Sequence, residues 1–130
     1  MKLLLDTCTF IWVASCPQRI PSAVRDLYAA PENAVYFSAV SAWEIAIKHQ
    51  AGKLQLPNNM RPIDYIKEVR RRHRIEPAGL DEESSAILEK MPDIHRDPFD
   101  RMLICQAIAN QMTILTPDPL ITQYPVLTRW

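Results

Sequence analysis

Short apolar runs alternate with helix-like segments along the whole chain of 130 residues. The clearest runs, at residues 2–5, 35–37 and 113–115, have the length and composition of strands buried in a parallel sheet. Weaker strand patterns lie at Ile75 and at residues 126–127. Periodic and capped segments predict helices over residues 7–15, 22–30, 38–51, 62–73, 81–90 and 97–110. This alternation predicts an α/β fold, a three-layer α/β/α sandwich with a mainly parallel central sheet of four to five strands, in a single domain over residues 1–130.

Capping residues define several of the predicted helix ends. We expect Ser22 to cap the second helix, and either Ser38 or Ser41 to cap the third, which Gly52 ends. Apolar residues including Trp43 surround the third helix on nearly all sides. That helix is therefore expected to be well buried.

The composition limits the classes of function. Lys plus Arg balances Asp plus Glu at 15 each, so any affinity for nucleic acid must come from local basic patches or from metal. The two glycines are too few for a GxGxxG or Walker-type phosphate loop. The apolar start is too short for a signal peptide or a membrane span, and three cysteines without CxxC spacing are typical of reduced thiols in a cytoplasmic protein.

Four acidic residues directly follow predicted strands or fall early in predicted helices: Asp6, Glu44, Asp100 and Asp118. These chain positions face one end of a parallel sheet, so we expect the four side chains to converge. Converging carboxylates repel each other, and a bound divalent cation is a usual remedy. Each acid also has a structural interpretation as a helix cap, a turn residue or, for Glu44, the partner of an Arg or Lys. One metal site would account for all four.

Three segments of the chain resemble the PIN-domain ribonucleases, and more narrowly the VapC toxins of bacterial type II toxin–antitoxin modules. LLLDTCTFIW is similar to the first strand and first catalytic aspartate of that family. SAVSAWEIAIKHQAGKLQLP resembles its glutamate helix, and HRDPFDRMLICQAIANQMTILTPDPLI its last catalytic segment. The resemblance covers nearly the whole chain and is least diagnostic over residues 61–91. It implies that Asp6, Glu44 and Asp100 are the core metal-binding acids and that Asp118 is a more variable fourth.

The resemblance also implies an activity and partners. The expected activity is that of a divalent-metal-dependent endoribonuclease, which uses Mg²⁺ or Mn²⁺ to hydrolyse RNA phosphodiester bonds. The expected partners are an RNA substrate, a cognate antitoxin and a second copy of the chain in a homodimer, with DNA bound only indirectly through the antitoxin. Two alternatives stay open: a PIN nuclease of RNA processing outside any toxin module, and a non-catalytic PIN scaffold that binds a partner.

Several residues near the acids have possible supporting roles. The hydroxyls of Thr7 and Thr116 are placed to hold a carboxylate or a metal-bound water. Asp97 is the expected N-cap of the last helix and contributes to the metal site, if at all, through a water. Arg101 either contacts substrate phosphate or pairs with Glu44 or Asp97.

Other positions allow a structural or a functional interpretation. The cluster Arg70–Arg74 is either a solvated helix end or a patch that follows the RNA backbone. Trp12 and Trp43 are expected in the core, and Trp130 is either loose or packed at an interface. A receiver domain is excluded because no lysine follows Lys90. A haloacid-dehalogenase-type phosphatase is excluded because Cys8 stands two residues after the first aspartate, where that class needs another.

Overall fold

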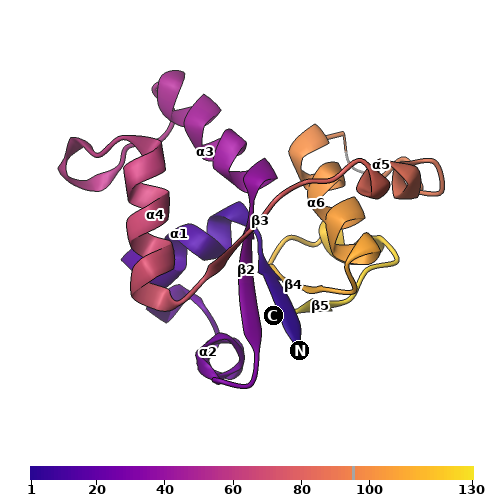
Figure 1. Cartoon of the computed structure of the whole chain (residues 1–130), viewed down its shortest axis with the longest axis horizontal. Coiled ribbons are helices and arrows are strands. Elements are labelled where there is room, and N and C mark those ends of the chain that lie inside the picture. The colour runs from indigo at the N-terminus through magenta and orange to yellow at the C-terminus, as the bar shows by residue number, and fades with distance from the viewer. Residues whose placement is uncertain (95) are drawn as a thin grey trace.

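The computed structural model describes residues 1–94 and 96–130. The strands are β1 (Lys2–Leu5), β2 (Ala34–Ser38), β3 (Glu76–Ala78), β4 (Thr113–Leu115) and β5 (Thr128–Arg129). The α-helices are α1 (Thr7–Ser15), α2 (Ser22–Ala29), α3 (Ala39–Gln50), α4 (Pro62–His73), α5 (Glu83–Leu88) and α6 (Pro98–Ala109). The order of elements along the chain alternates between strand and helix for most of its length (Figure 1).

The five strands form one parallel sheet in the order β3-β2-β1-β4-β5. The central strand β1 pairs with β2, Leu5 lying opposite Phe37, and with β4, Leu5 lying opposite Leu115. Its three leucines have no exposed surface, which explains why the strand is a continuous apolar run. The predicted parallel sheet is confirmed.

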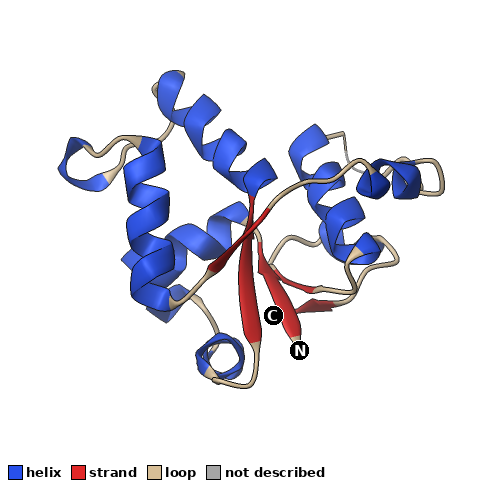
Figure 2. Ribbon diagram, in the orientation of Figure 1, coloured by secondary structure: helices blue, strands red, loops and turns tan. Residues whose placement is uncertain are grey.

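Helices cover both faces of this sheet (Figure 2). Successive side chains of a strand point to opposite faces. Leu3 and Leu5 accordingly join an apolar cluster with residues of α1 to α4, whereas Leu4 joins a second cluster with residues of α6. On the first face the ring of Phe10 in α1 stacks on that of Phe37 in β2, with the ring centroids 3.7 Å apart. The predicted three-layer α/β/α sandwich is confirmed.

Most predicted elements lie where the sequence placed them, and the clearest differences are at β3, at β5 and at α5, which spans Glu83–Leu88 instead of residues 81–90. Helices α1 and α4 and strands β1 and β4 have the predicted bounds. β3 begins one residue after Ile75, and β5 is Thr128–Arg129 instead of residues 126–127. Apolar residues mark where a segment is buried, as Ile75 is. Strand limits depend on backbone pairing, which for β5 joins Thr128 to Ile114.

Two predictions about helices α2 and α3 are wrong in part. Ser22 is the first residue of α2 and makes no capping hydrogen bond, because Pro21 occupies the cap position. Ser38 caps α3 by accepting a hydrogen bond from the backbone N–H of Val40, at 3.0 Å. α3 is only half covered, with Trp43 68% exposed, because its contacts with α1, α4 and α6 leave its remaining side open.

The lengths of the helices and the state of the cysteines bear on the expectations about membrane spans and thiols. None of the helices in the described part of the chain is long and apolar enough to cross a membrane. Cys8, Cys16 and Cys105 carry free thiols, and Cys105 is buried.

Candidate functional site

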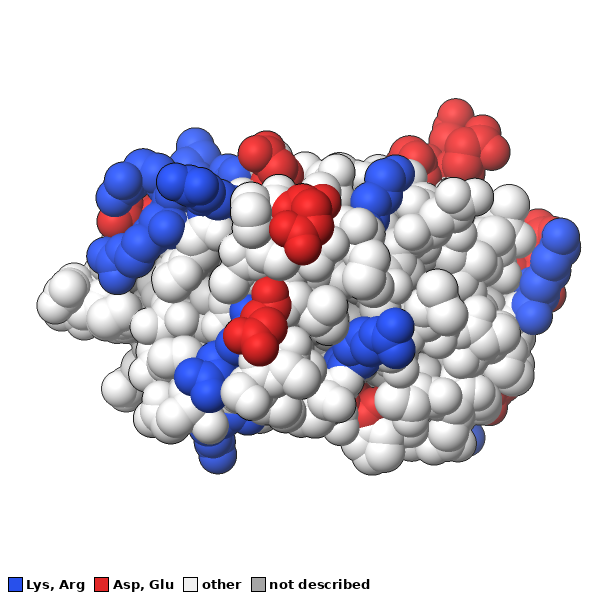
Figure 3. Space-filling view, turned by 90° about the horizontal axis from the view of Figure 1, so that it is seen from below, with Lys and Arg blue, Asp and Glu red and all other residues white. Residues whose placement is uncertain are grey.

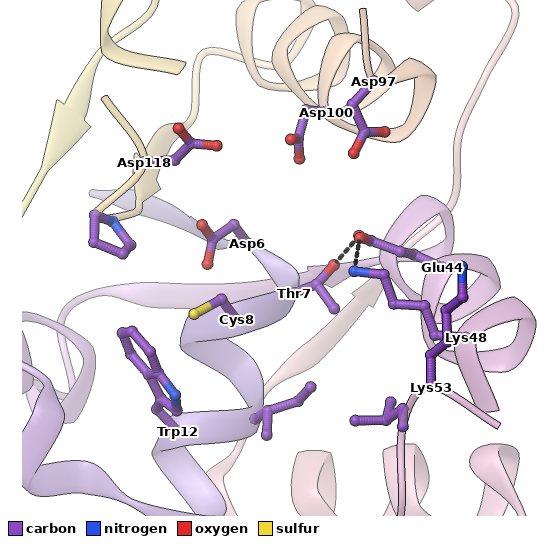
Figure 4. Close-up of a pocket in the computed structure, with 13 residues that line it drawn as sticks. Asp6, Thr7, Cys8, Trp12, Glu44, Lys48, Lys53, Asp97, Asp100 and Asp118 are labelled. Atoms are coloured by element: carbon purple, nitrogen blue, oxygen red, sulfur yellow. Dashed lines mark hydrogen bonds and ion pairs between the residues drawn. The ribbon is translucent and has the colours of Figure 1, made fainter. Parts of the chain in front are cut away.

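A pocket of about 490 Å³ opens where the carboxyl ends of the central strands meet the amino ends of the neighbouring helices. Five acidic side chains line it: Asp6, Glu44, Asp97, Asp100 and Asp118. Figure 4 shows Asp97 and Asp100 facing Asp6 and Glu44 across the pocket, with Asp118 beside them. The structure therefore brings together the four acids that the sequence singled out, and adds Asp97 to them.

The topology explains this convergence. Asp6 directly follows β1, and Glu44 lies in the second turn of α3, which directly follows β2. Asp100 lies in the first turn of α6, and Asp118 follows β4 by three residues. Because β1, β2 and β4 are parallel neighbours, their carboxyl ends lie at one edge of the sheet.

Asp6 is held on both carboxylate oxygens. It caps α1, with Oδ1 accepting a hydrogen bond from the backbone N–H of Thr9 at 2.7 Å. Oδ2 accepts a hydrogen bond from the hydroxyl of Thr116 at 2.5 Å. The residue is only 6% exposed. Burial raises the pKa of Asp6 above its usual value and the charge of Asp118 adds to this, while the hydrogen bonds from Thr116 and Thr9 oppose it.

Thr116 connects two of the acids. Besides donating to Asp6, its oxygen accepts a hydrogen bond from the backbone N–H of Asp118 at 3.0 Å. Asp118 in turn accepts a hydrogen bond from the backbone N–H of Leu120 at 2.9 Å, so the turn role considered for it from the sequence is also present. The completely buried Thr116 thus fixes the relative positions of Asp6 and Asp118.

Glu44 is buried in α3 and both of its oxygens have partners (Figure 4). Oε1 accepts a hydrogen bond from the hydroxyl of Thr7 at 2.6 Å. Oε2 lies 2.8 Å from Nζ of Lys48, one helical turn further along α3. The Arg or Lys partner that the structural interpretation of Glu44 allowed is therefore Lys48, and no ion pair joins Glu44 to Arg101 in the described part of the chain.

The last acidic segment combines capping with a place in the pocket. Asp97 is the N-cap of α6, as predicted, and accepts a hydrogen bond from the backbone N–H of Phe99 at 2.9 Å. Asp100 projects from the first turn of the same helix. Arg101 does not line the pocket, and its buried Nε has no hydrogen-bond partner within residues 1–94 and 96–130.

Sequence reasoning missed several residues that line the pocket, among them Cys8, Trp12, Lys48 and Lys53. The spacing of four between Glu44 and Lys48 on one helix was the available signal for the ion pair. Burial, together with the negative charge of Asp6, raises the pKa of the Cys8 thiol to about 11. The thiol is therefore protonated near neutral pH and is a poor nucleophile.

The expectation that Trp12 and Trp43 lie in the core changes with the structure. Trp12 is partly buried at the pocket, where its ring lies 5.9 Å from that of Trp130. Trp43 is largely exposed, so its prediction as a core residue is wrong.

The basic cluster Arg70–Arg74 ends α4 and precedes β3. It therefore lies beside the amino ends of the strands, whereas the pocket lies at their carboxyl ends. In Figure 3 basic side chains gather at the left, the side on which α4 lies in Figure 1. Arg71 and Arg72 pair with Glu68 of the same helix. The cluster thus does not border the acidic pocket.

The donor set of the pocket fits a hard divalent cation in chemistry, because carboxylate oxygens are the ligands that Mg²⁺ and Mn²⁺ prefer. Yet no three His, Cys, Asp or Glu side chains in the described part of the chain form a group that could hold a metal ion as they stand. Asp6 and Glu44 are instead held by threonine hydroxyls and, for Glu44, by Lys48.

Comparisons with known proteins agree with this architecture. The family model of the PIN domain matches residues 3–127. No curated protein matches the chain. A chain of VapBC2 from Rickettsia felis, solved bound to a DNA fragment from its promoter, has a TM-score of 0.75 at 13% identity, with 100% of this chain and 99% of that chain covered.

Two further solved structures are similar. For a chain of VapBC-1 from nontypeable Haemophilus influenzae, the TM-score is 0.67 at 19% identity, and the match covers 99% of this chain and 97% of that chain. For a chain of FitAB bound to an IR36 DNA fragment, the TM-score is 0.61 at 21% identity, and the match covers 98% of this chain and 93% of that chain. At these identities the likeness establishes a shared fold.

Proposed function

Because the chain belongs to the PIN-domain family, a family of nucleases, we propose that it is a divalent-metal-dependent endoribonuclease that hydrolyses RNA phosphodiester bonds. The observation that carries this proposal is the convergence of five carboxylates from four separate segments on one pocket. Capping and ion pairing account for several of these acids singly, whereas their convergence on one pocket suits a divalent cation.

We assign the metal-binding and catalytic role to Asp6, Glu44 and Asp100, with Asp118 as a fourth acid and Asp97 acting through a water. When bound, Mg²⁺ or Mn²⁺ activates water for attack on the phosphate and offsets the negative charge that develops there. The chain's own contribution is to orient the acids before the ion arrives. Thr116 and the Thr9 amide hold Asp6, and Thr7 holds one oxygen of Glu44.

This activity is tested by incubating purified protein with total cellular RNA and Mg²⁺ or Mn²⁺, and mapping the cut sites. We expect discrete cuts that disappear when a chelator is added. The Asp100→Asn variant, run in parallel, controls for a contaminating nuclease because it should not cut. Cutting that survives both the chelator and the substitution would contradict the proposal.

Thr116→Val is expected to lower the cleavage rate by about ten- to a hundredfold, the usual cost of losing a group that orients a metal ligand. Valine has nearly the same shape but neither donates to Asp6 nor accepts from the backbone N–H of Asp118. Rates should be compared at saturating metal, on protein shown by circular dichroism to be folded. Thr116→Ser keeps the hydroxyl and should recover most of the rate. If Thr116→Val cleaves RNA as fast as Thr116→Ser, the Thr116 hydroxyl does not orient the acids.

We further propose that the protein is the toxin of a type II toxin–antitoxin pair, acting in the cytoplasm as a homodimer. The similar VapBC and FitAB structures support a cognate antitoxin as partner, with DNA reached only through that antitoxin. The exposed Trp43, with an apolar pocket on each side, offers a surface for a protein partner. Co-purification with the product of an adjoining gene would distinguish a toxin from a PIN nuclease of RNA processing. Absence of divalent-metal binding would instead favour a non-catalytic scaffold.

A further inference from the structure

One cation of the protein itself already lies at the acidic pocket. Nζ of Lys48 is 2.8 Å from Oε2 of Glu44, and the side chain of Lys48 is 51% exposed (Figure 4). Glu44 is the main source of negative potential at this ammonium group, and Asp97 and Asp100 add to it. A lysine is ordinarily charged near neutral pH, and this one faces acids from two helices, α3 and α6.

We propose that Lys48 is an internal counter-cation of this pocket, which competes with the divalent ion for Glu44 and thereby sets the metal affinity of the protein. The inference rests on the proposed function only for the nature of the competing ion. Lys48 acts in it as a positioning residue, since it works through Glu44.

The first step of the argument concerns the oxygens of Glu44. Both are engaged, one by the hydroxyl of Thr7 and the other by Lys48. A hydroxyl can remain hydrogen-bonded to a carboxylate that also binds a metal ion. An ammonium group and a divalent cation, by contrast, repel each other when they share one carboxylate. When Glu44 binds a divalent cation, the Lys48 ammonium group must therefore either leave Oε2 or stay close to the positive charge of that cation.

The second step concerns the environment of the pair. The other ion pairs in the described part of the chain join Arg61 to Asp64, and Arg71 and Arg72 to Glu68, with acid side chains 37–49% exposed. The side chain of Glu44 is only 9% exposed. Exposed helical pairs are screened by water and contribute little, whereas a buried carboxylate needs a counter-charge. Lys48 supplies that charge to Glu44 while no metal is bound.

The third step is the release of the lysine. Lys48 has a flexible stem of four carbons and is half exposed, so its ammonium group can move into water without strain. Exchange of Lys48 for a divalent ion on Glu44 would make available one of the five acids that line the pocket.

The test is the affinity for Mn²⁺, measured by isothermal titration calorimetry on the full chain without RNA. Lys48→Met removes the charge and keeps an unbranched side chain. We expect this variant to bind Mn²⁺ more tightly, on the order of tenfold, because one unit charge no longer repels the divalent ion across several ångströms of a solvated pocket. Lys48→Arg keeps the charge and should bind nearly as the wild type does.

Two matched lysine variants separate the ion pair from general charge. Lys53 lines the same pocket but forms no ion pair within the described residues, so Lys53→Met should tighten binding by less than about threefold. Lys67→Met, on the exposed side of α4, should leave the affinity unchanged. Thermal unfolding without metal establishes that each variant is folded.

The outcomes distinguish this inference from the proposed function. If the wild type binds Mn²⁺ and Lys48→Met binds it with equal or lower affinity, the competition is overturned while the metal site stands. If Mn²⁺ binds to neither the wild type nor Lys48→Met, the proposed metal dependence fails and the inference fails with it. If Lys48→Met binds Mn²⁺ much more tightly than Lys53→Met does, the result supports both the metal site and the competition by Lys48.

Discussion

Replacing Asp6 with asparagine is expected to lower the rate of RNA cleavage on the order of a hundredfold to a thousandfold, the usual cost of removing one preorganised charged or hydrogen-bonding group from a reacting centre. Asp6 is the most buried of the acids that line the pocket, and both its oxygens are fixed in place. Asparagine retains the shape and one oxygen but loses the negative charge, so the pocket should bind a divalent cation more weakly. The measurement is a single-turnover cleavage rate at saturating Mg²⁺.

The same substitution should not unfold the protein. Burial disfavours the charged form of Asp6, and Asp118 adds repulsion, so removal of the charge should leave the melting temperature equal or slightly higher. Asparagine can still accept the capping hydrogen bond from Thr9. Asp26→Asn, an exposed substitution on α2, is the matched control and should change neither rate nor stability. An Asp6→Asn variant that cleaves at the wild-type rate would remove Asp6 from the active site.

Phe10→Ala is expected to reduce the free energy of unfolding by about 3–5 kcal/mol, as for other fully buried aromatic residues. The ring of Phe10 has no exposed surface, stacks on Phe37 and meets Tyr65 edge-on at 6.4 Å between centroids. Its removal would leave a cavity between α1, β2 and α4. Domains are typically stable by only about 5–15 kcal/mol, so the substitution should remove a large share of the free energy of unfolding.

Urea denaturation followed by circular dichroism measures this loss. Phe10→Leu refills much of the cavity and should recover a good part of the stability. The substitution also concerns the site, because Phe10 lies one turn after Asp6 and stacks on Phe37, the residue directly before Ser38, which caps α3. A loss below about 1 kcal/mol would show that the contact between α1 and β2 does not anchor this face of the sheet.

Much of the fold follows from local features of the sequence. The central strands are apolar runs because both faces of a parallel sheet are covered, and this pattern located β1 and β4 to the residue. The Asp97-Pro98 pair located the start of α6 because capping chemistry involves only a few adjacent residues. The convergence of Asp6, Glu44, Asp100 and Asp118 was also foreseeable, since each follows a strand or opens a helix in a parallel fold.

Contacts between distant segments were decided only by the tertiary structure. The sequence left open whether Arg101, 57 positions away, pairs with Glu44; in the described part of the chain it does not, and Glu44 pairs within its own helix with Lys48. It placed Trp43 in the core, whereas α3 is covered on one side only. It also could not show that Thr116, 110 positions from Asp6, holds that carboxylate. The physical reason is range: periodicity and capping act within a few residues, whereas burial and pairing across the fold depend on how remote elements pack.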